Sequence, residues 1–275
     1  QLGAIVEIVK RKHRVLLIAG GPAREYRFLR NMLYRDPEIH LEVWLQSAQG
    51  DAAQEADDVL FEFPDKEDHL FNFDCIVAFD PNWELLDERD VEQLDRFVAD
   101  KAGGLIVVSG PVYTAEWTRY RRGRDRRIDT IKSLYPVQFY TQGSASLNLG
   151  RVGGEQPWPL SFSVEGLQAE FLWLEDNAKL SEQTWASFEG VYGYYRVKDP
   201  KPGAQVFARF SDPDTVIDGQ LPIYLAGHFY GAGRVFFQAS GEMWRVRSVD
   251  DSYFDTYYTR LLRWASAGRM LRDSN

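Results

Sequence analysis

Short apolar runs alternate with amphipathic segments through the first 140 residues. Residues 14–19, 74–80 and 105–109 are almost continuous apolar runs, which is typical of strands buried on both faces of a parallel sheet. Residues 24–34 and 87–98 instead carry apolar side chains at steps of three and four, the spacing of a helix that packs one face on a core. The alternation predicts a doubly wound, mainly parallel α/β sheet of the flavodoxin-like or Rossmann-like kind.

The pattern changes between residues 141 and 220, where short pieces rich in Trp, Tyr, Gly and Pro replace the long helical segments. Residues 205–210 alternate in the manner of a half-buried strand. Residues 221–239 predict a hairpin, and a last helix begins near Ser252. We therefore predict a core formed by residues 1–140, a β-rich insertion at 141–220 and a return to the core over 221–275, all within a single structural domain.

Composition and charge narrow the classes of partner. The chain has 275 residues, of which 44% are hydrophobic, so it can bury a large core. Its net charge of -9 disfavours broad contact with nucleic acid or anionic lipid. The longest apolar stretches fall well short of the ~20 residues that a membrane-spanning helix needs, so we expect no direct membrane insertion. The chain begins at Gln1 without a signal peptide, which indicates a fragment of a longer protein.

A set of glycine-containing motifs follows the strands in a defined order. They are RVLLIAGGP at 14–22 leading into EYRFLR at 25–30, FDCIVA at 73–78, GGLIVVSGP at 103–111, GAGRV at 231–235 and EMWR at 242–245. In this order they resemble the class I glutamine amidotransferase-like superfamily, specifically the domains found in membrane-anchored bacterial proteins beside von Willebrand type A domains. The resemblance implies a bacterial protein of the cell envelope, with an extracytoplasmic (periplasmic) location for this fragment.

The resemblance also implies that the catalytic residues are degenerate. Active members carry a cysteine on a Gly-x-Cys-x-Gly elbow and a later His-x-Glu pair, which here fall at Ser109 or Gly110 and at Ser240 to Glu242. Valine and proline stand where the strained elbow needs glycine. A hydroxyl without an imidazole also lacks its general base, a loss that typically lowers the rate by ~10²-fold to 10⁴-fold. We expect no catalytic residue of this type, and the enzyme assignment leans towards no.

The remaining reactive side chains favour structural roles. Cys75 falls within a buried run, where apolar surroundings raise the pKa of a thiol and make it inert. The four histidines, at positions 13, 40, 69 and 228, have no second ligand at a recognised metal spacing. We therefore predict no metal site and no cofactor.

The binding candidates are mainly cations. The segment 119–127 is rich in arginine and would attract phosphate, carboxylate or an acidic protein surface, although a solvated segment explains the same pattern. His228 precedes a glycine turn, and the resemblance includes an arginine in its closing motif. The candidate binding residues are Arg119, Arg121, Arg122, Arg124, His228 and Arg245.

Three functions remain open at this stage. The main hypothesis is a non-catalytic amidotransferase-like module that binds an unknown protein partner, or other domains of the same polypeptide, in a larger envelope protein. One alternative is an active hydrolase or amidotransferase that uses Ser109 with Glu242 and a base such as His228. The other is a carbohydrate-binding module in which aromatic residues of the insertion, such as Trp158 and Trp173, stack on sugar rings.

Overall fold

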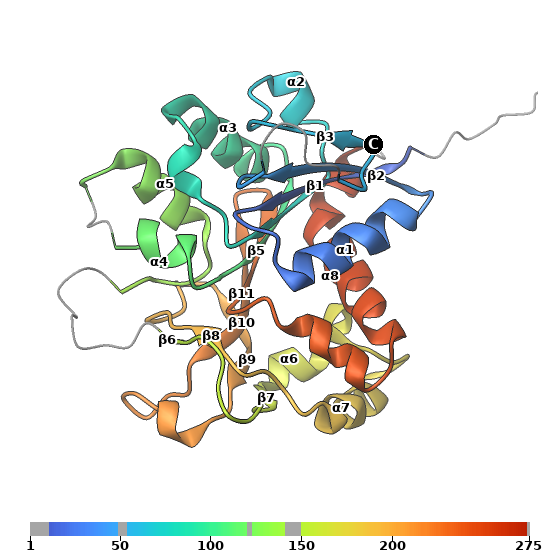
Figure 1. The fold of residues 1–275 in the computed structure, drawn as a ribbon, viewed down its shortest axis with the longest axis vertical. Helices are drawn as coiled ribbons and strands as arrows, with labels where there is room; N and C mark the ends of the chain where they lie inside the picture. The colour runs from blue at the N-terminus through green and yellow to red at the C-terminus, as the bar shows by residue number, and fades with distance from the viewer. Residues whose placement is uncertain (1–10, 49–53, 120–122, 141–149, 274–275) are drawn as a thin grey trace, which may run out of the picture.

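A nine-stranded mixed sheet forms the centre of the described part of the chain (Figure 1). The structure is a computed structural model and describes residues 11–48, 54–119, 123–140 and 150–273. The strand order is β3-β2-β1-β4-β5-β11-β10-β9-β7. The strands are β1 (His13–Ala19), β2 (Ile39–Leu45), β3 (Asp58–Val59), β4 (Cys75–Phe79), β5 (Gly104–Val108), β7 (Leu160–Phe162), β9 (Gln205–Phe210), β10 (Ile223–Tyr230) and β11 (Gly233–Gln238).

The parallel half of the sheet explains the continuous apolar runs. The strands from β3 to β11 in the sheet order run parallel to one another. Every residue of β4 and β5 is buried, because helices cover both faces of these strands. In Figure 1, α1 (Arg24–Arg35) and α8 (Ser252–Asp273) lie on one face, and α3 (Glu88–Ala99) and α5 (Arg126–Leu134) lie on the other.

The carboxyl half of the chain extends the same sheet in the antiparallel sense. β10 and β11 form the predicted hairpin, and its turn contains Gly231 at φ +56°. β9 then pairs with β10, and β7 pairs with β9. The hydrogen bonds of these strands therefore continue the central sheet to its far edge.

Short elements connect and cover the strands. The helices not yet described are α2 (Glu67–Leu70), α4 (Tyr113–Trp117), α6 (Val164–Gln168) and α7 (Ala178–Ser187), with single 3-10 turns at η1 (Trp83–Leu85), η2 (Glu170–Leu172), η3 (Pro213–Thr215) and η4 (Met243–Ser248). A second, two-stranded sheet joins β6 (Gly150–Arg151) to β8 (Tyr194–Tyr195). None of the described helices combines the length and the apolar character needed to cross a membrane.

The predicted fold class is wrong. We expected a flavodoxin-like or Rossmann-like doubly wound sheet with a β-rich insertion. The sheet is instead mixed, and its antiparallel strands belong to the same nine-stranded sheet as the parallel ones. The alternation at Gln205–Phe210 shows that one face of this strand is buried, but it does not show which strand pairs with it. The division of the chain at residues 140 and 220 stays a prediction.

A close approach between the sheet and α8 leads to a stability prediction. A Cβ atom on Gly104, in the middle of the sheet, would lie 2.7 Å from the backbone carbonyl carbon of Ala265 in α8. Because that contact is with backbone, we expect Gly104→Ala to lower the free energy of unfolding by about 1–3 kcal/mol in chemical denaturation. Gly21→Ala is the matched control, since an added Cβ there meets nothing within 4 Å. Equal stability of the two variants would contradict this packing.

Candidate functional site

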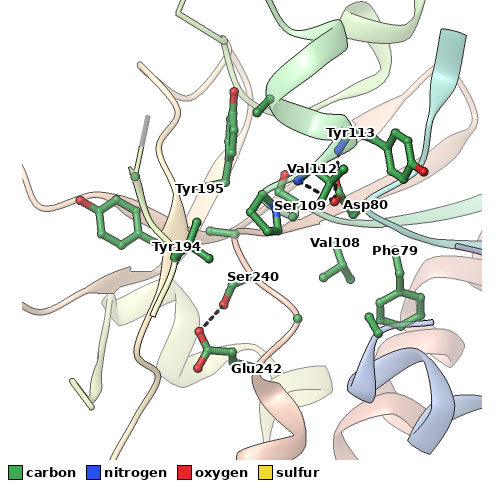
Figure 2. A pocket seen from close by; sticks show the side chains of 18 of the residues that line it. Phe79, Asp80, Val108, Ser109, Val112, Tyr113, Tyr194, Tyr195, Ser240 and Glu242 are labelled. Carbon is green, nitrogen blue, oxygen red and sulfur yellow. Dashed lines mark hydrogen bonds between the residues drawn. The ribbon is translucent and has the colours of Figure 1, made fainter. Parts of the chain in front are cut away.

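A cavity of about 660 Å³ lies where the parallel strands β1, β4, β5 and β11 end (Figure 2). The residues that directly follow β4, β5 and β11 line the cavity, and so does the loop after β1. Loops at the carboxyl ends of adjacent parallel strands meet at one edge of a sheet, which makes this edge the usual place for ligands in open α/β sheets. The volume is within the range of small-molecule sites.

Asp80 organises the loops on one side of the cavity. It follows β4 at φ 40°, a left-handed conformation that aspartate adopts more readily than most residues. Its carboxylate accepts hydrogen bonds from the backbone N–H groups of Val112, Tyr113 and Thr114, at 3.0, 3.2 and 2.7 Å, and from the Thr114 hydroxyl at 2.8 Å. Asp80 thus satisfies the amino end of α4, and both of its oxygens are engaged by the protein.

Ser109 ends β5 and is the residue at the predicted elbow. Its side chain is 3% exposed, and its Oγ has no hydrogen-bond partner within the described residues. A nucleophile elbow holds its residue in a strained turn, whereas Ser109 is absent from the non-glycine residues with positive φ. Ser109 therefore lines the cavity, but its hydroxyl is buried and has no base among the described residues to take its proton.

Ser240 and Glu242 follow β11 and are tied into the surrounding structure. The Ser240 hydroxyl lies 2.7 Å from the Tyr224 hydroxyl. The Glu242 carboxylate accepts hydrogen bonds from the backbone N–H groups of Tyr192 (3.0 Å) and Gly193 (2.8 Å), and from Arg245 Nε at 2.8 Å. Glu242 therefore anchors the chain that leads into β8 and is not free to act as a base.

Two tyrosines of β8 form the opposite wall (Figure 2). Tyr194 and Tyr195 are 5% and 6% exposed, so little of each ring remains open beyond the face that lines the cavity. The Tyr195 hydroxyl lies 2.7 Å from Thr118 Oγ1, and the Tyr194 hydroxyl accepts a hydrogen bond from Arg196 at 2.9 Å. Both rings are therefore held in place, and they project to opposite sides of β8, where they pack against Phe210 and Phe139.

Two arginines complete the lining. Arg151 Nη2 pairs with Asp212 Oδ2 at 2.5 Å, so its charge is already balanced. Arg119 follows α4 and is exposed, and no ion pair involves it within the described part of the chain. The cavity thus carries one cation without a protein counter-ion in that part.

The other predicted binding residues lie apart from one another. Gly110 lines the cavity beside Asp80, which fills the space that a Cβ would need. Arg245 lies over the Tyr192 ring at 4.4 Å, and Arg124 is exposed in the turn before α5. Arg121 and Arg122 lie outside the described residues.

His228 is at the wrong end of the sheet to serve Ser109. In the sheet register His228 is opposite Val235, and Val235 is opposite Leu105, four residues before Ser109. At ~3.3 Å per residue this is about 13 Å along the strands. The His228 ring instead lies 2.8 Å from the Leu134 carbonyl oxygen.

A buried carboxyl group lies beneath the cavity floor. Glu25 of α1 is fully buried and accepts hydrogen bonds from Tyr258 and from Gln238 Nε2, the latter at 2.9 Å. Gln238 in turn donates to the Ser240 carbonyl oxygen at 2.7 Å, which links Glu25 to the loop that lines the cavity. Burial raises the pKa of Glu25 to about 7, against the opposing effect of its hydrogen bonds.

Sequence reasoning found Ser109 and Ser240 but missed Asp80, Glu25 and the tyrosine wall. Asp80 carries a usable signal, because it is a polar residue directly after a buried strand at the ligand-binding edge of the sheet. Tyr194 and Tyr195 carry no such signal, since they reach the cavity only through the pairing of β8 with β6.

Comparisons with known proteins give a likeness of fold only. No family model matches the chain, and no curated protein matches it. Similar solved structures include the cytoplasmic protein STM1381 from Salmonella typhimurium LT2, with 14% identity, a TM-score of 0.56 and coverage of 92% of this chain and 99% of that one. Another is the cytoplasmic protein STM3548 from Salmonella typhimurium, with 13% identity, a TM-score of 0.55 and coverage of 91% and 98%. The β-galactosidase from Rahnella sp. R3 matches at 12% identity and a TM-score of 0.47, over 92% of this chain and 31% of that one.

These findings correct the resemblance read from the sequence. Assignment to the class I glutamine amidotransferase-like superfamily is wrong, because no family model or curated protein supports it and the two cytoplasmic proteins of similar fold carry other names. The main function hypothesis, a degenerate amidotransferase-like module of an envelope protein, is wrong with it. A glycine beside an apolar strand serves the tight turns of many α/β proteins, so motifs of this kind do not specify one family.

The buried carboxyl group generates a prediction of pH dependence. Burial raises the pKa of Glu25 from its ordinary value of 4.5 to about 7, so the folded state retains this proton up to about pH 7. The protonated carboxyl group therefore makes its full contribution to the free energy of unfolding below pH 4.5, and this contribution is lost as the pH rises through 7. Glu25→Gln keeps the group uncharged, so its stability relative to wild type should rise by on the order of 3 kcal/mol between pH 4.5 and 8.

Denaturation at a series of pH values measures this difference. Glu182→Gln is the matched control, because Glu182 is exposed on α7 and the same substitution there should give a difference that does not change with pH. A flat difference for Glu25→Gln as well would show that the carboxyl group is not held protonated.

Proposed function

We propose that the chain is a binding module whose cavity takes a small hydroxylated organic ligand of the sugar class. The observation that carries the proposal is a cavity of about 660 Å³ at the carboxyl ends of the parallel strands, lined by Ser109, by Tyr194 and Tyr195, and by the exposed Arg119.

The chemistry of the lining supports this class of ligand. Small-molecule sites combine mainly apolar and aromatic walls with a few placed polar groups, and here Phe79, Val108, Val112 and the tyrosines of β8 line the cavity together with Arg119. A sugar presents both kinds of surface, because its ring has apolar C–H faces and a rim of hydroxyl groups. The arginine at the edge, Arg119, adds a donor for a ligand oxygen.

Binding accounts for this site better than hydrolysis through Ser109. The three groups required for that alternative are separated, since Ser109 Oγ has no partner in the described structure, Glu242 is engaged and His228 lies at the other end of the strands. A hydroxyl is a weak nucleophile until an adjacent base activates it.

The aromatic residues of the proposed site differ from those first considered. Trp173 donates to the Leu167 carbonyl oxygen at 2.9 Å, and Trp158 packs against the core beside its bridge to Val191. Neither lines the cavity. The part of the chain between 141 and 220 contributes instead through β6 and β8, which carry the tyrosine wall.

The predictions of a partner and of a location for the protein rest on different observations. A protein partner, or another domain of the same polypeptide, stays a prediction. The extracytoplasmic location was inferred from the amidotransferase-like resemblance and loses that support, while two structures of similar fold are named as cytoplasmic proteins.

Filling the cavity tests the proposal. Val152 lines it and is 80% exposed, so Val152→Trp should block the cavity without disturbing the core. We expect saturation-transfer NMR with a panel of neutral mono- and disaccharides to detect binding to wild type and to lose the signal in Val152→Trp. Val164→Trp is the matched control, because Val164 is 66% exposed outside the cavity and should retain binding. Binding that survives Val152→Trp would contradict the proposal.

The hydroxyl provides a second, finer test. Ser109→Ala removes one hydrogen bond worth about 0.5–1.5 kcal/mol, so the Kd for a bound sugar should rise by roughly 3-fold to 10-fold. Ser161→Ala, on the exposed side of β7, should leave the Kd unchanged. Turnover of an ester or amide that Ser109→Ala abolishes would instead favour the hydrolase alternative.

A further inference from the structure

A cluster of histidine and carboxylate side chains lies at the other edge of the sheet, on β2, β3 and α2. His40 and Glu42 are two residues apart on β2, so their side chains project from the same face. Asp58 of β3 is opposite Glu42 in the parallel register, and His69 arrives from α2. No residue of this cluster lines the cavity described above.

The two distances from His40 Nε2 to carboxylate oxygens match those between ligands of one metal ion. His40 Nε2 lies 3.4 Å from Glu42 Oε1 and 3.3 Å from Asp58 Oδ2, and all three atoms lie within 4.8 Å of one another. Ligands about 2.0–2.1 Å from a tetrahedral zinc ion are roughly 3.3–3.4 Å apart. The two distances from His40 therefore equal the edge of such a tetrahedron.

Ordinary hydrogen bonding explains these contacts poorly. Within the described residues the His40 ring makes no hydrogen bond, although two carboxylate oxygens lie near its Nε2. A nitrogen-to-oxygen hydrogen bond is usually 2.7–3.2 Å long, and one N–H cannot point at two oxygens at once. His69 shows the contrast, since its Nε2 lies 2.6 Å from Glu42 Oε2.

The neighbouring groups fit a bound cation. Glu42 is almost fully buried, and its carboxylate also pairs with Arg14 Nη2, 2.7 Å from Oε1. The Asp57 carboxylate lies 4.0 Å from His40 Nδ1, on the far side of the ring from the proposed ligand atom. With neutral histidines, these three carboxylates and one guanidinium leave a net negative charge around the cluster.

We propose that His40 Nε2, Glu42 Oε1 and Asp58 Oδ2 bind a divalent transition-metal ion of the zinc class. A fourth position faces solvent beside Asp58, which is 62% exposed. His69 and Arg14 hold the Glu42 carboxylate as outer partners, the arrangement that orients metal ligands in proteins. The ion would connect the short edge strand β3 to β2.

The proposal also explains why the sequence predicted no metal site. His40 and Glu42 are close in the chain, but Asp58 and His69 come from separate elements, so no compact ligand motif exists. Strand register brings the set together, and register is not visible in ligand spacing.

Calorimetric titration of metal-depleted, untagged protein with Zn²⁺ tests the site. We expect one equivalent to bind and the melting temperature to rise with Zn²⁺ concentration. His40→Ala and Asp58→Asn should each abolish this binding, and His69→Gln should weaken it by about 10-fold to 100-fold. Asp68→Asn is the matched control, because Asp68 is exposed on α2 and carries none of the proposed ligand atoms.

The variants make the result unambiguous. His40 and Asp58 lie at the surface side of the cluster, so circular dichroism should confirm that both variants remain folded. Zinc binding that persists in the double variant His40→Ala and Asp58→Asn, or no zinc uptake by wild type, would overturn the proposal.

Discussion

The carboxylate of Asp80 fixes the part of the molecule on which the cavity depends. It receives the backbone N–H groups at the start of α4, and its own backbone N–H donates to the Val108 carbonyl oxygen at 2.7 Å. The adjoining loops pack closely on Asp80, since a Cβ on Gly20 or Gly110 would lie 2.2 Å or 2.5 Å from its atoms. One charged residue thus holds the loops after β4 and β5 together at the edge of the sheet where the cavity lies.

The sequence predicted the parallel half of the fold well at the level of elements. Continuous apolar runs at β1, β4 and β5 identify strands buried on both faces, and the steps of α1 and α3 identify their covering helices. The antiparallel half was misassigned, because alternation shows that β9 has one buried face and gives no partner. The family resemblance failed for a related reason, since glycine turns after strands follow from general backbone geometry.

The two proposed sites also depend on strand pairings that the sequence alone does not show. Ser109 and Ser240 were visible as strand-end residues, whereas the tyrosine wall and the His40 cluster exist only through pairings between distant segments. In the first site the Ser109 hydroxyl has no hydrogen-bond partner within the described structure, and in the second two carboxylate oxygens crowd one nitrogen of the His40 ring. Buried or crowded polar groups are normally satisfied in folded proteins, so such exceptions indicate where a ligand completes the structure.

The central claim is that the cavity at the strand ends binds a hydroxylated ligand directly. Backbone amide NMR of the isotope-labelled protein during titration with the best-binding sugar of a panel measures this residue by residue. The account predicts saturable shifts concentrated at Ser109, Tyr195 and Gly241, which line the cavity, with Glu182 on α7 unmoved. Saturable shifts confined to surfaces outside the cavity, or none at millimolar ligand, would contradict it.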